Sequence, residues 1–559
     1  MKATLTIKNF RSLRNVTLNL KLNTFLFGPN GSGKSSIWKA LNFFNNNVIE
    51  LNQFDNKTTF YLQANTNPGT YKDIVYKNEL KRNIEYKYTY QSNFKEFWYL
   101  DSGIEFEDFI ESIEKSKGKK EQNVGRAEYF NNLFKSSDLN ERLEYLTYKS
   151  MREEFINEHF SIIDFDIQTC FKNTTDHRYL KKLIIKDNDS KCFIEYRKGD
   201  EEIKDKLDRP GVLKKVSLFN DEKLNRLFSE FRYKNDYKWI LNRYIKGSKI
   251  IKEMGEELLK FIHEKLDTNK EWTNYDEQEK CNIFTVGLVQ LFRFYFIFPR
   301  IIERYLGIYH ITPIRSDAEK FYDINTREFD NLSQYNLLES FPTLDIASKM
   351  IDYIDKNEVD WESLRRDVYS FYWISIFNKL YEMKLAKGLY KIETEDIRKF
   401  MVINMNGTYS NLSDISSGLT QILPIIFNSQ TSLGMNPLTK YNDNPNYTVF
   451  VEQPELHLHP KLQADLANYL ISYDYKYIAP NFIIETHSEH IIRKIQVLVA
   501  KGEIEKEKIA VYYFNIDSGE TKAKEMELLD NGFFKEPWPD GFFDDSYNLT
   551  KELLMAGKD

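Results

Sequence analysis

The sequence predicts an α/β fold with a strand-rich N-terminal lobe, and three observations support this class. First, an apolar stretch at 24–27 runs into a glycine-rich loop at 28–35, and a helical pattern follows the loop. Second, two further apolar runs, at 447–452 and 482–486, read as buried strands that end in polar residues. Third, the first two hundred residues contain several short strand-like runs separated by turn residues.

The loop Gly28-Pro29-Asn30-Gly31-Ser32-Gly33-Lys34-Ser35 matches the pattern G-x-x-x-x-G-K-[ST] at every fixed position. In such a loop the glycines let backbone N–H groups curl around phosphate oxygens, and the following helix N-terminus adds a partial positive charge. We expect Lys34 to be partly exposed and to reach the β- and γ-phosphates of ATP, and the Ser35 hydroxyl to bind Mg²⁺. The pattern and its context predict a nucleotide-binding loop rather than a chance glycine-rich turn.

Composition excludes several classes of protein. The 559-residue chain carries a net charge of −6, so no global basic field indicates nucleic acid, and any such contact must come from a local patch. Its three cysteines are far apart and form no C-x-x-C pair, so neither a zinc site nor a disulfide framework is indicated. The N-terminus lacks the apolar core of a signal peptide, and charges interrupt the most apolar stretch, at 284–309. We therefore expect a cytoplasmic protein without a membrane segment.

The remaining elements follow from hydrophobic periodicity. Residues 71–90 alternate like a strand with one exposed face, and 183–196 reads as a hairpin. Apolar residues recur at helical spacing beyond residue 205 and again over 343–395. The predicted domains are an N-terminal part of a nucleotide-binding head (1–204), a helical insertion (205–304), a C-terminal part of that head (305–500) and a tail subdomain (501–559).

Three later stretches carry further candidate groups. The Ser-Ser-Gly turn at 416–418 precedes an apolar helix, which makes it either a second anion-binding helix N-terminus or a plain helix cap. The strand that ends in Glu452 has the form of a Walker B strand, whose carboxylate holds Mg²⁺ directly or through water. His487 follows the strand at 482–486 and can donate to a γ-phosphate, unless it is a core histidine. His457 and His459 alternate in a loop, but no third ligand at matching spacing supports zinc.

The order of phosphate loop, Gln63, Ser-Ser-Gly turn, Walker B acid and Thr-His-Ser run resembles the ABC-class ATPase heads of the RecF, SMC and OLD group. The runs 452–460, 485–490 and 538–543 narrow the resemblance to prokaryotic AAA15/AAA21-type ATPases. That group includes the ATPase subunits of anti-phage systems of the Septu and PARIS kinds. The resemblance covers roughly residues 1–100, 305–320 and 400–545 and is weak in the predicted helical insertion.

The resemblance implies a role for each matching residue. Gln63 would contact Mg²⁺ and the attacking water, and Ser416 and Gly418 would meet the γ-phosphate of ATP bound to a second subunit. The implied ATP-binding residues are Arg11, Gly28, Asn30, Gly31, Ser32, Gly33, Lys34, Ser35, Ser36, Gln63, Ser416 and Gly418. The implied Mg²⁺ residues are Ser35, Gln63 and Glu452, and the implied catalytic residues are Glu452, Gln453, Glu455 and His487.

One departure from the family pattern has chemical content. Most ABC ATPases place a glutamate directly after the Walker B acid, where it polarises the attacking water, but this chain has Gln453. A glutamine can orient water and cannot take its proton. Glu455 is the nearest substitute. Hydrolysis is therefore expected to be slow unless Glu455 acts as the base.

The resemblance favours an ATPase subunit that forms a homodimer or higher homo-oligomer around ATP and controls a separate effector. That effector would be a nuclease in bacterial anti-phage defence, and nucleic acid would be contacted through the complex. A DNA-repair ATPase of the RecF or SMC kind, which binds DNA directly, is the alternative. A nuclease within this chain is disfavoured, because only 69 residues follow His490 and no second acidic cluster suits a two-metal site.

Overall fold

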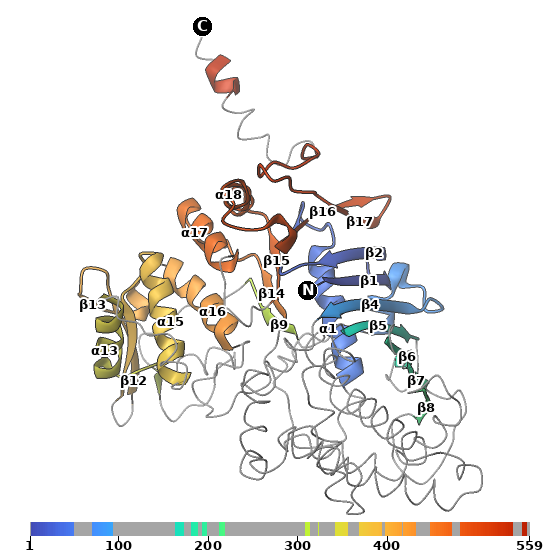
Figure 1. The fold of residues 1–559 in the computed structure, drawn as a ribbon, viewed down its shortest axis with the longest axis horizontal. Helices are drawn as coiled ribbons and strands as arrows, with labels where there is room; N and C mark the ends of the chain where they lie inside the picture. Colours follow the sequence, from blue (N-terminus) through green and yellow to red (C-terminus); the bar gives the residue numbers. More distant parts are fainter. Residues whose placement is uncertain are drawn as a thin grey trace, which may run out of the picture. The chain divides into compact units, whose positions relative to one another are not determined.

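The strand that leads into the glycine-rich loop lies inside a sheet whose other strands all come from beyond residue 300 (Figure 1). The computed structural model describes residues 2–49, 70–92, 163–172, 180–187, 193–197, 212–217, 308–313, 322–323, 341–355, 368–393, 397–415, 417–431, 448–471, 481–539 and 551–555. Two compact units are formed. The first comprises Met1–Asn9, Phe44–Phe60 and Glu79–Glu303, and the second comprises Phe10–Phe43, Tyr61–Asn78 and Arg304–Asp559.

The first unit is built on an antiparallel sheet. Across it lie, in order, β1 (Lys2–Phe10), β4 (Ile84–Ser92), β5 (Ile163–Phe171), β6 (Leu180–Asp187), β7 (Phe193–Arg197) and β8 (Val212–Ser217). Alternation along β4 buries Ile84, Tyr86 and Tyr88 on one face. Phe44 stacks on the Tyr86 ring at 5.0 Å, and Phe171 meets the same ring edge-on at 5.6 Å. The pairing of β6 with β7 confirms the predicted hairpin.

The predicted helical insertion is only partly within the described residues. β8 begins inside the range 205–304 and pairs with β7, so the described part of that range is a strand and not a helix. Its sequence, Val-Leu-Lys-Lys-Val-Ser, contains two β-branched valines, which favour a strand, and its pairing with β7 decides the conformation. The rest of 205–304 lies outside the described residues, and the domain bounds stay predictions.

The second unit contains a six-stranded sheet in the order β17-β16-β3-β15-β14-β9. Its members are β3 (Asn23–Phe27), β9 (Ile308–Ile311), β14 (Thr448–Glu452), β15 (Asn481–Thr486), β16 (Ile509–Asp517) and β17 (Glu520–Glu525). Neighbouring strands are parallel except for the β16–β17 hairpin. Every residue of β3 and β15 is buried, as expected for strands covered on both faces. The sheet confirms both later apolar runs as strands.

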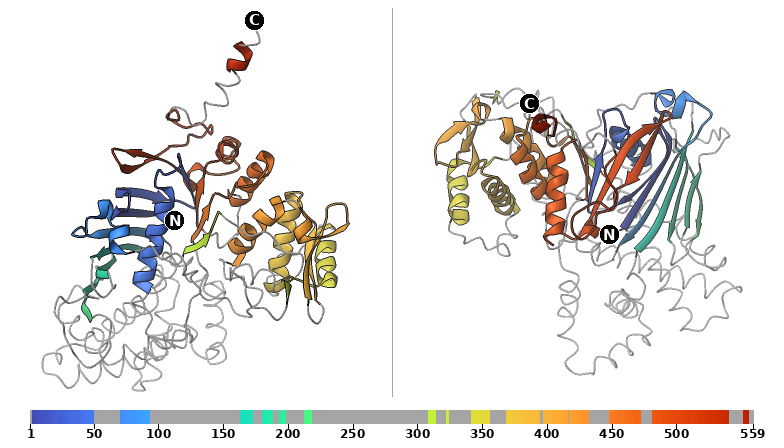
Figure 2. Two further views of the ribbon diagram at one scale, coloured as in Figure 1. Left: turned by 180° about the vertical axis from the view of Figure 1, so that it is seen from behind. Right: turned by 90° about the horizontal axis from the view of Figure 1, so that it is seen from above.

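Helices accompany the strands of this sheet. They are α1 (Lys34–Ile49), α16 (Ser417–Thr431), α17 (Pro460–Ile471) and α18 (Glu489–Ala500). α17 and α18 pack side by side, as both views of Figure 2 show. Ser488 caps α18 by accepting a hydrogen bond from the Ile491 N–H, and the buried residues Ile491, Ile492, Ile495, Leu498 and Val499 form one apolar face. Among the described residues no helix is long and apolar enough to cross a membrane.

A smaller sheet in the second unit pairs β10 (Tyr322–Asp323), β12 (Ile397–Ile403) and β11 (Gly388–Glu393), and β13 (Tyr409–Asn411) also pairs with β12. α13 (Leu344–Asp355) and α15 (Val368–Glu382) pack against β11. The prediction that 343–395 is helical is therefore right for these helices and wrong for β11, whose pairing with β12 decides its conformation. Short helical segments are α2 (Tyr71–Ile74), η2 (Tyr76–Asn78), η5 (Leu412–Asp414) and η6 (Lys506–Lys508).

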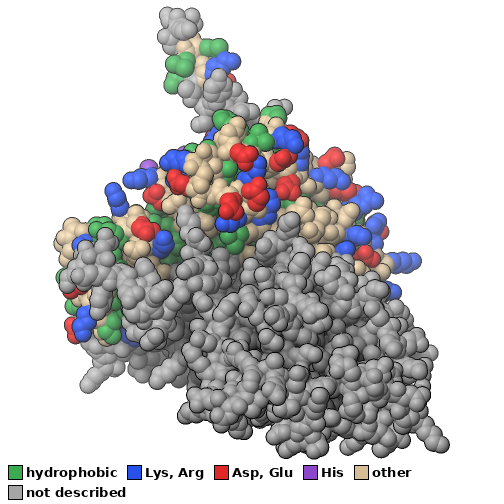
Figure 3. Space-filling model, viewed as in Figure 1, with side chains coloured by type: hydrophobic (Ala, Val, Ile, Leu, Met, Phe, Trp, Pro, Cys, Tyr) green, Lys and Arg blue, Asp and Glu red, His purple; other side chains and the backbone are tan. Residues whose placement is uncertain are grey.

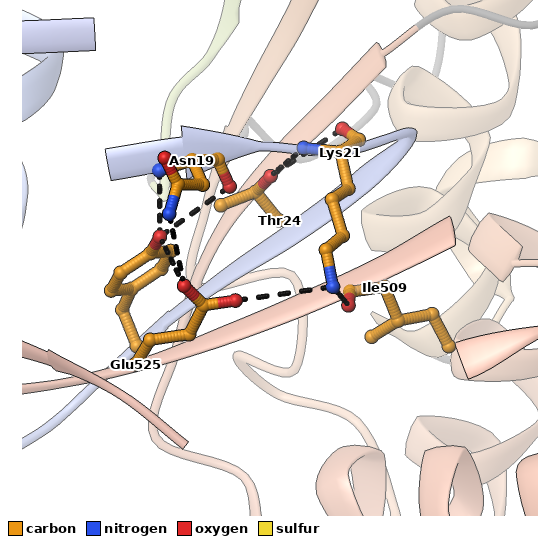
Figure 4. A network of polar contacts seen from close by, with 6 residues as sticks. Asn19, Lys21, Thr24, Ile509 and Glu525 are labelled. Atoms are coloured by element: carbon orange, nitrogen blue, oxygen red, sulfur yellow. Dashed lines mark hydrogen bonds and ion pairs between the residues drawn. The ribbon is translucent and has the colours of Figure 1, made fainter. Parts of the chain in front are cut away.

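The turn between β2 (Leu13–Leu20) and β3 is anchored on the C-terminal strands (Figure 4). The Asn19 N–H donates to the Tyr512 hydroxyl at 2.6 Å, and the Asn19 amide reaches Glu525 at 3.3 Å. Lys21 donates to the Ile509 carbonyl at 2.9 Å, and its ammonium lies 3.9 Å from Glu525. These polar contacts hold the entry to β3 against β16 and β17.

Candidate nucleotide-binding site

The glycine-rich loop connects β3 to α1, as the sequence predicts. Gly28 and Gly33 both have positive φ, of +147° and +99°, which an L side chain rarely adopts. A Cβ on Gly28 would lie 2.2 Å from the Phe514 carbonyl oxygen, and one on Gly33 would lie 2.2 Å from the Thr521 hydroxyl oxygen. Glycine is needed at both positions because of the backbone conformation and because strands β16 and β17 pack closely on the loop.

β17 also holds the loop through a hydroxyl group. The Thr521 hydroxyl lies 3.0 Å from the Ser32 carbonyl oxygen and 2.8 Å from the Ser12 hydroxyl. A hydroxyl has a single proton, so when Thr521 donates to Ser32 it accepts from Ser12. The Thr521 N–H donates to the Ser12 carbonyl at 3.0 Å. The β16–β17 hairpin therefore supports the phosphate loop through the hydrogen bonds of Thr521.

Lys34 is buried, contrary to the expectation of a partly exposed side chain. Its side chain is 2% exposed, and its ammonium donates to the Gly28 and Pro29 carbonyl oxygens, both at 2.9 Å. The side chain folds along its own loop, which satisfies the ammonium and removes it from solvent. Burial lowers the pKa of Lys34, and the carboxylates of Glu485 and Glu455 oppose that shift.

Glu485 lies beside both Lys34 and Ser35. Ser35 Oγ donates to Glu485 Oε1 at 3.0 Å, and Lys34 Nζ lies 4.0 Å from the same oxygen. Burial raises the pKa of Glu485 to about 7, the negative charge of Glu452 adds to that shift, and Ser35 and Lys34 oppose it. The sequence reasoning assigned no role to Glu485. The available signal was an acidic residue directly after the apolar run Phe482–Ile484.

Glu452 ends β14 as the sequence predicts, and a second unforeseen residue contacts it. His310 Nε2 of β9 lies 3.2 Å from Glu452 Oε1, and the His310 side chain is 8% exposed. The Trp38 ring of α1 stacks on the imidazole with ring centres 4.0 Å apart. Pairing of β14 with β9 brings the histidine beside the acid. His310 therefore lies between the Trp38 ring of α1 and the carboxylate of Glu452.

The segment after Glu452 is pinned to the end of β15. Glu455 accepts from the Thr486 hydroxyl at 2.8 Å and from the His487 N–H at 2.7 Å. Gln453 has a φ of +44°, and its N–H donates to the Glu485 carbonyl at 2.8 Å. His487 is half-buried, and burial followed by the Lys34 charge lowers its pKa to about 4. Its imidazole is neutral at pH 7, so it carries one N–H that can donate to a phosphate.

The other predicted site residues are spread more widely. Asn30 and Gly31 are exposed at the loop, and Ser36 is half-buried in the first turn of α1. Arg11 follows β1 with a φ of +50°, and its N–H donates to the Ile74 carbonyl at 2.7 Å. Gly418 is half-buried in the first turn of α16. Gln63 and Ser416 lie outside the described residues.

The residues present fit ATP with Mg²⁺. Two buried oxygens, Ser32 Oγ and Glu485 Oε2, have no hydrogen-bond partner among the described residues, so a ligand at the loop would satisfy them. Ser35, Glu452 and Glu485 supply the hydroxyl and carboxylate oxygens that Mg²⁺ prefers. In the described part of the chain, no three or more His, Cys, Asp or Glu side chains form a metal site of their own. Mg²⁺ is commonly held by one or two carboxylates together with phosphates.

Three SMC structures resemble the chain weakly. The Smc head domain with an extended coiled coil bound to the C-terminal domain of ScpA, from Pyrococcus furiosus, is 11% identical over 99% of each chain, with a TM-score of 0.32. The SMC head domain from Thermotoga maritima is 9% identical over 94% of this chain and 99% of that chain, with a TM-score of 0.33. The SmcHead bound to the C-winged helix domain of ScpA is 9% identical over 94% and 98%, with a TM-score of 0.34. At TM-scores this low, the superpositions indicate neither the function of the chain nor its family.

Sequence-family comparison is more decisive. No curated protein matches the chain. A family model described as a protein of unknown function (DUF3696) matches residues 504–553, which include β16 and β17. A model described as an AAA ATPase domain (AAA_15) matches residues 1–492. That match spans most of the chain and agrees with the α/β sheet and its phosphate loop, so the predicted α/β ATPase fold is confirmed and the chain belongs to the AAA ATPase domain family AAA_15.

Proposed function

We propose that the chain binds ATP with Mg²⁺ at the loop 28–35, hydrolyses it slowly, and couples the bound nucleotide to a separate effector. The main support for an ATP site is that four residues lie close together at the ends of β3, β14 and β15, namely Lys34, Ser35, Glu452 and Glu485. Lys34 would exchange the two loop carbonyls for the β- and γ-phosphates, and Ser35 and Glu452 would hold Mg²⁺. When Mg²⁺ is bound, it neutralises part of the negative charge of the phosphates.

Slow hydrolysis follows from the residue after the Walker B acid. Gln453 can orient the attacking water through its amide and cannot accept its proton. Neutral His487 can donate its N–H to the γ-phosphate. A site of this kind keeps ATP bound for long periods, which suits a switch better than a motor.

Dimerisation around ATP is the second part of the proposal. Gly418 lies in the first turn of α16, where the helix N-terminus favours an anion. In a head-to-tail homodimer or higher homo-oligomer, Ser416 and Gly418 of one subunit would meet the γ-phosphate on the other. Each ATP would then be contacted by two subunits, so assembly would depend on the bound nucleotide.

The effector and its setting rest on the sequence motifs. The runs 452–460 and 485–490 resemble the ATPase subunits of anti-phage systems, so we assign the chain to bacterial defence with a separate nuclease as effector. It would act in the cytoplasm, and any nucleic acid would be contacted through the complex. On the face drawn in Figure 3, acidic and basic side chains of the described residues are interspersed, which favours this arrangement over a dedicated DNA track on that face. Direct DNA binding of the RecF or SMC kind is the alternative.

Lys34→Ala is the first test of the ATP site. Removal of the ammonium takes away the phosphate counter-charge, so we expect the melting-temperature increase with ATP and Mg²⁺ in wild type to vanish in the variant. Lys39→Ala, on a half-buried residue of α1 beyond the loop, is the control and should keep the increase. Equal increases in wild type and Lys34→Ala would contradict the assignment.

The assignment of a separate effector has its own test. The purified chain with Mg²⁺ or Mn²⁺ should leave plasmid, linear and single-stranded DNA intact. Cleavage that persists in Lys34→Ala would place a nuclease within the chain. ATP-dependent binding to linear duplex DNA by the chain alone, measured by gel shift, would favour the DNA-repair alternative.

A further inference from the structure

Glu485 is a buried carboxylate whose hydrogen bonding is incomplete. The residue is 4% exposed, and its Oε1 accepts from Ser35 while its Oε2 has no hydrogen-bond partner among the described residues. Removing a carboxylate from water is costly unless its oxygens are paired with donors or bind a metal ion. A second group is therefore expected to meet Oε2 when the site is in use.

The sheet places Glu485 beside Glu452. The two residues are register partners on the parallel strands β14 and β15, so their side chains leave the same face of the sheet. Neighbouring strands lie about 4.8 Å apart, which brings the two carboxylates within reach of one cation. The Ser35 hydroxyl, which binds Mg²⁺ in phosphate loops, is already hydrogen-bonded to Glu485.

The local charges favour a cation at this point. Glu452 and Glu455 both repel the negative charge of Glu485, and the nearest ammonium, Lys34 Nζ, lies 4.0 Å from it. That ammonium is needed for phosphates once ATP is bound, so it then no longer balances the charge of Glu485. A divalent cation between Glu452, Glu485 and Ser35 would neutralise them.

We infer that Glu485 is a second carboxylate holder of the ATP-bound Mg²⁺, acting with Ser35 and Glu452 directly or through a metal-bound water. The inference rests on the proposed ATP site and deepens it. β15 then carries a metal-holding carboxylate beside Glu452. The strand ends at Thr486, directly before His487, whose N–H would donate to the γ-phosphate.

The test separates metal binding from nucleotide binding. The dissociation constant of the non-hydrolysable analogue AMP-PNP is measured on the full chain by calorimetry, first in excess EDTA and then in saturating Mg²⁺. Wild type is compared with Glu485→Gln, Glu485→Asp and Glu452→Gln. Glu527→Gln is the matched control, because Glu527 is an exposed carboxylate in an ion pair with Lys535. Mn²⁺ titration of each AMP-PNP complex, followed by electron paramagnetic resonance, measures the metal affinity.

In Glu485→Gln we expect AMP-PNP affinity in EDTA to be unchanged or tighter, since a negative charge near the triphosphate is lost. The Mg²⁺-dependent gain in affinity and the Mn²⁺ affinity should fall about 10–100-fold, with Glu452→Gln behaving alike. Glu485→Asp keeps a carboxylate and should retain part of the gain, and Glu527→Gln should match wild type.

Two results would overturn the inference. A full Mg²⁺ gain in Glu485→Gln would mean that its carboxylate does not hold the metal. An equal loss of affinity in EDTA and in Mg²⁺ would mean that Glu485 only shapes the nucleotide pocket. Failure of wild type to bind AMP-PNP under both conditions would instead contradict the proposed ATP site.

Discussion

The proposal of slow hydrolysis depends on a single residue, Gln453. The segment Gln453–Glu455 is held against β15 by the Gln453 N–H and by both carboxylate oxygens of Glu455. Glu455 is thus already used as an acceptor for Thr486 and His487. A carboxylate with those partners is a weaker candidate for the general base than its sequence position indicates, because its lone pairs face structural donors.

Gln453→Glu should accelerate ATP hydrolysis. It adds a proton acceptor beside the Walker B acid, and general-base assistance typically contributes about 10²–10⁴-fold. Steady-state phosphate release from wild type and variant measures the change. Glu455→Gln is the companion variant: if Glu455 were the base, it would remove most wild-type hydrolysis and Gln453→Glu would have little effect. Fast wild-type turnover that survives Glu455→Gln would contradict slow hydrolysis altogether.

At this scale the sequence predicted correctly that the loop lies between β3 and α1, that Glu452 ends β14 and that His487 follows β15, because each belongs to a local pattern of strand, turn and helix. It could not identify Glu485 as a partner of Ser35, because the two residues are 450 positions apart and meet only through the pairing of β15 with β3. The burial of Lys34 was missed for a related reason. The phosphate pattern describes the lysine with its ligand, whereas here its ammonium binds the loop carbonyls.

Among the elements, the β16–β17 hairpin has the clearest link to function. It lies within the region matched by the family of unknown function, residues 504–553, and it contacts the phosphate loop through Phe514 and Thr521. Sequence patterns place strands of this kind but not the loop that they support. Pairing with distant strands also explains β8 and β11. Their segments fall in ranges whose apolar spacing predicts helices, but β8 pairs with β7 and β11 pairs with β12.

Thr521→Val should loosen the phosphate loop. The change keeps the side-chain shape but removes the hydroxyl that joins Ser32 to Ser12, so the unfolding free energy should fall by about 1 kcal/mol. ATP should also raise the melting temperature less than in wild type. Urea unfolding and melting with nucleotide measure both effects. Thr521→Ser keeps the hydroxyl and should recover nucleotide binding. If Thr521→Val and Thr521→Ser behave alike, the hydroxyl does not matter.

Glu520 gives β17 a pH-dependent attachment. Its carboxylate accepts from Arg14 at 2.7 Å and from Lys522 and Tyr76 at 3.1 Å, and these bonds, Arg14 first, lower the pKa of Glu520 from 4.5 to about 2. A lowered pKa in the folded state stabilises the fold above about pH 4.5, and that contribution is lost as the pH falls toward 2.

We therefore expect Glu520→Gln to melt below wild type at neutral pH, with the gap closing between about pH 4.5 and pH 2. Melting curves across this range measure the gap. Glu505→Gln, at a side chain that is 69% exposed, is the control and should show a small gap throughout. A gap for Glu520→Gln that stays constant with pH would rule out the attachment.

At the scale of the whole molecule, the proposal predicts that ATP drives the assembly of a dimer. Gly418→Arg should block ATP-driven dimer formation, because a bulky side chain in the first turn of α16 would obstruct a γ-phosphate from another subunit. Light scattering of the Gly418→Arg and wild-type proteins with AMP-PNP and Mg²⁺ measures the dimer. Nucleotide affinity of the monomer should be unchanged. Loss of that affinity would place Gly418 in the ATP site of its own subunit.

The position of β3 in the sheet also determines when this strand can fold during synthesis of the chain. Its two neighbours, β15 and β16, begin at residues 481 and 509, so β3 cannot pair with either of them until that part of the chain has left the ribosome. At ribosomal speeds of about 5–20 residues per second, that wait lasts roughly 25–90 s. During it, the apolar residues Phe25, Leu26 and Phe27 stay without their final partners, so the nascent chain is a natural client for chaperones.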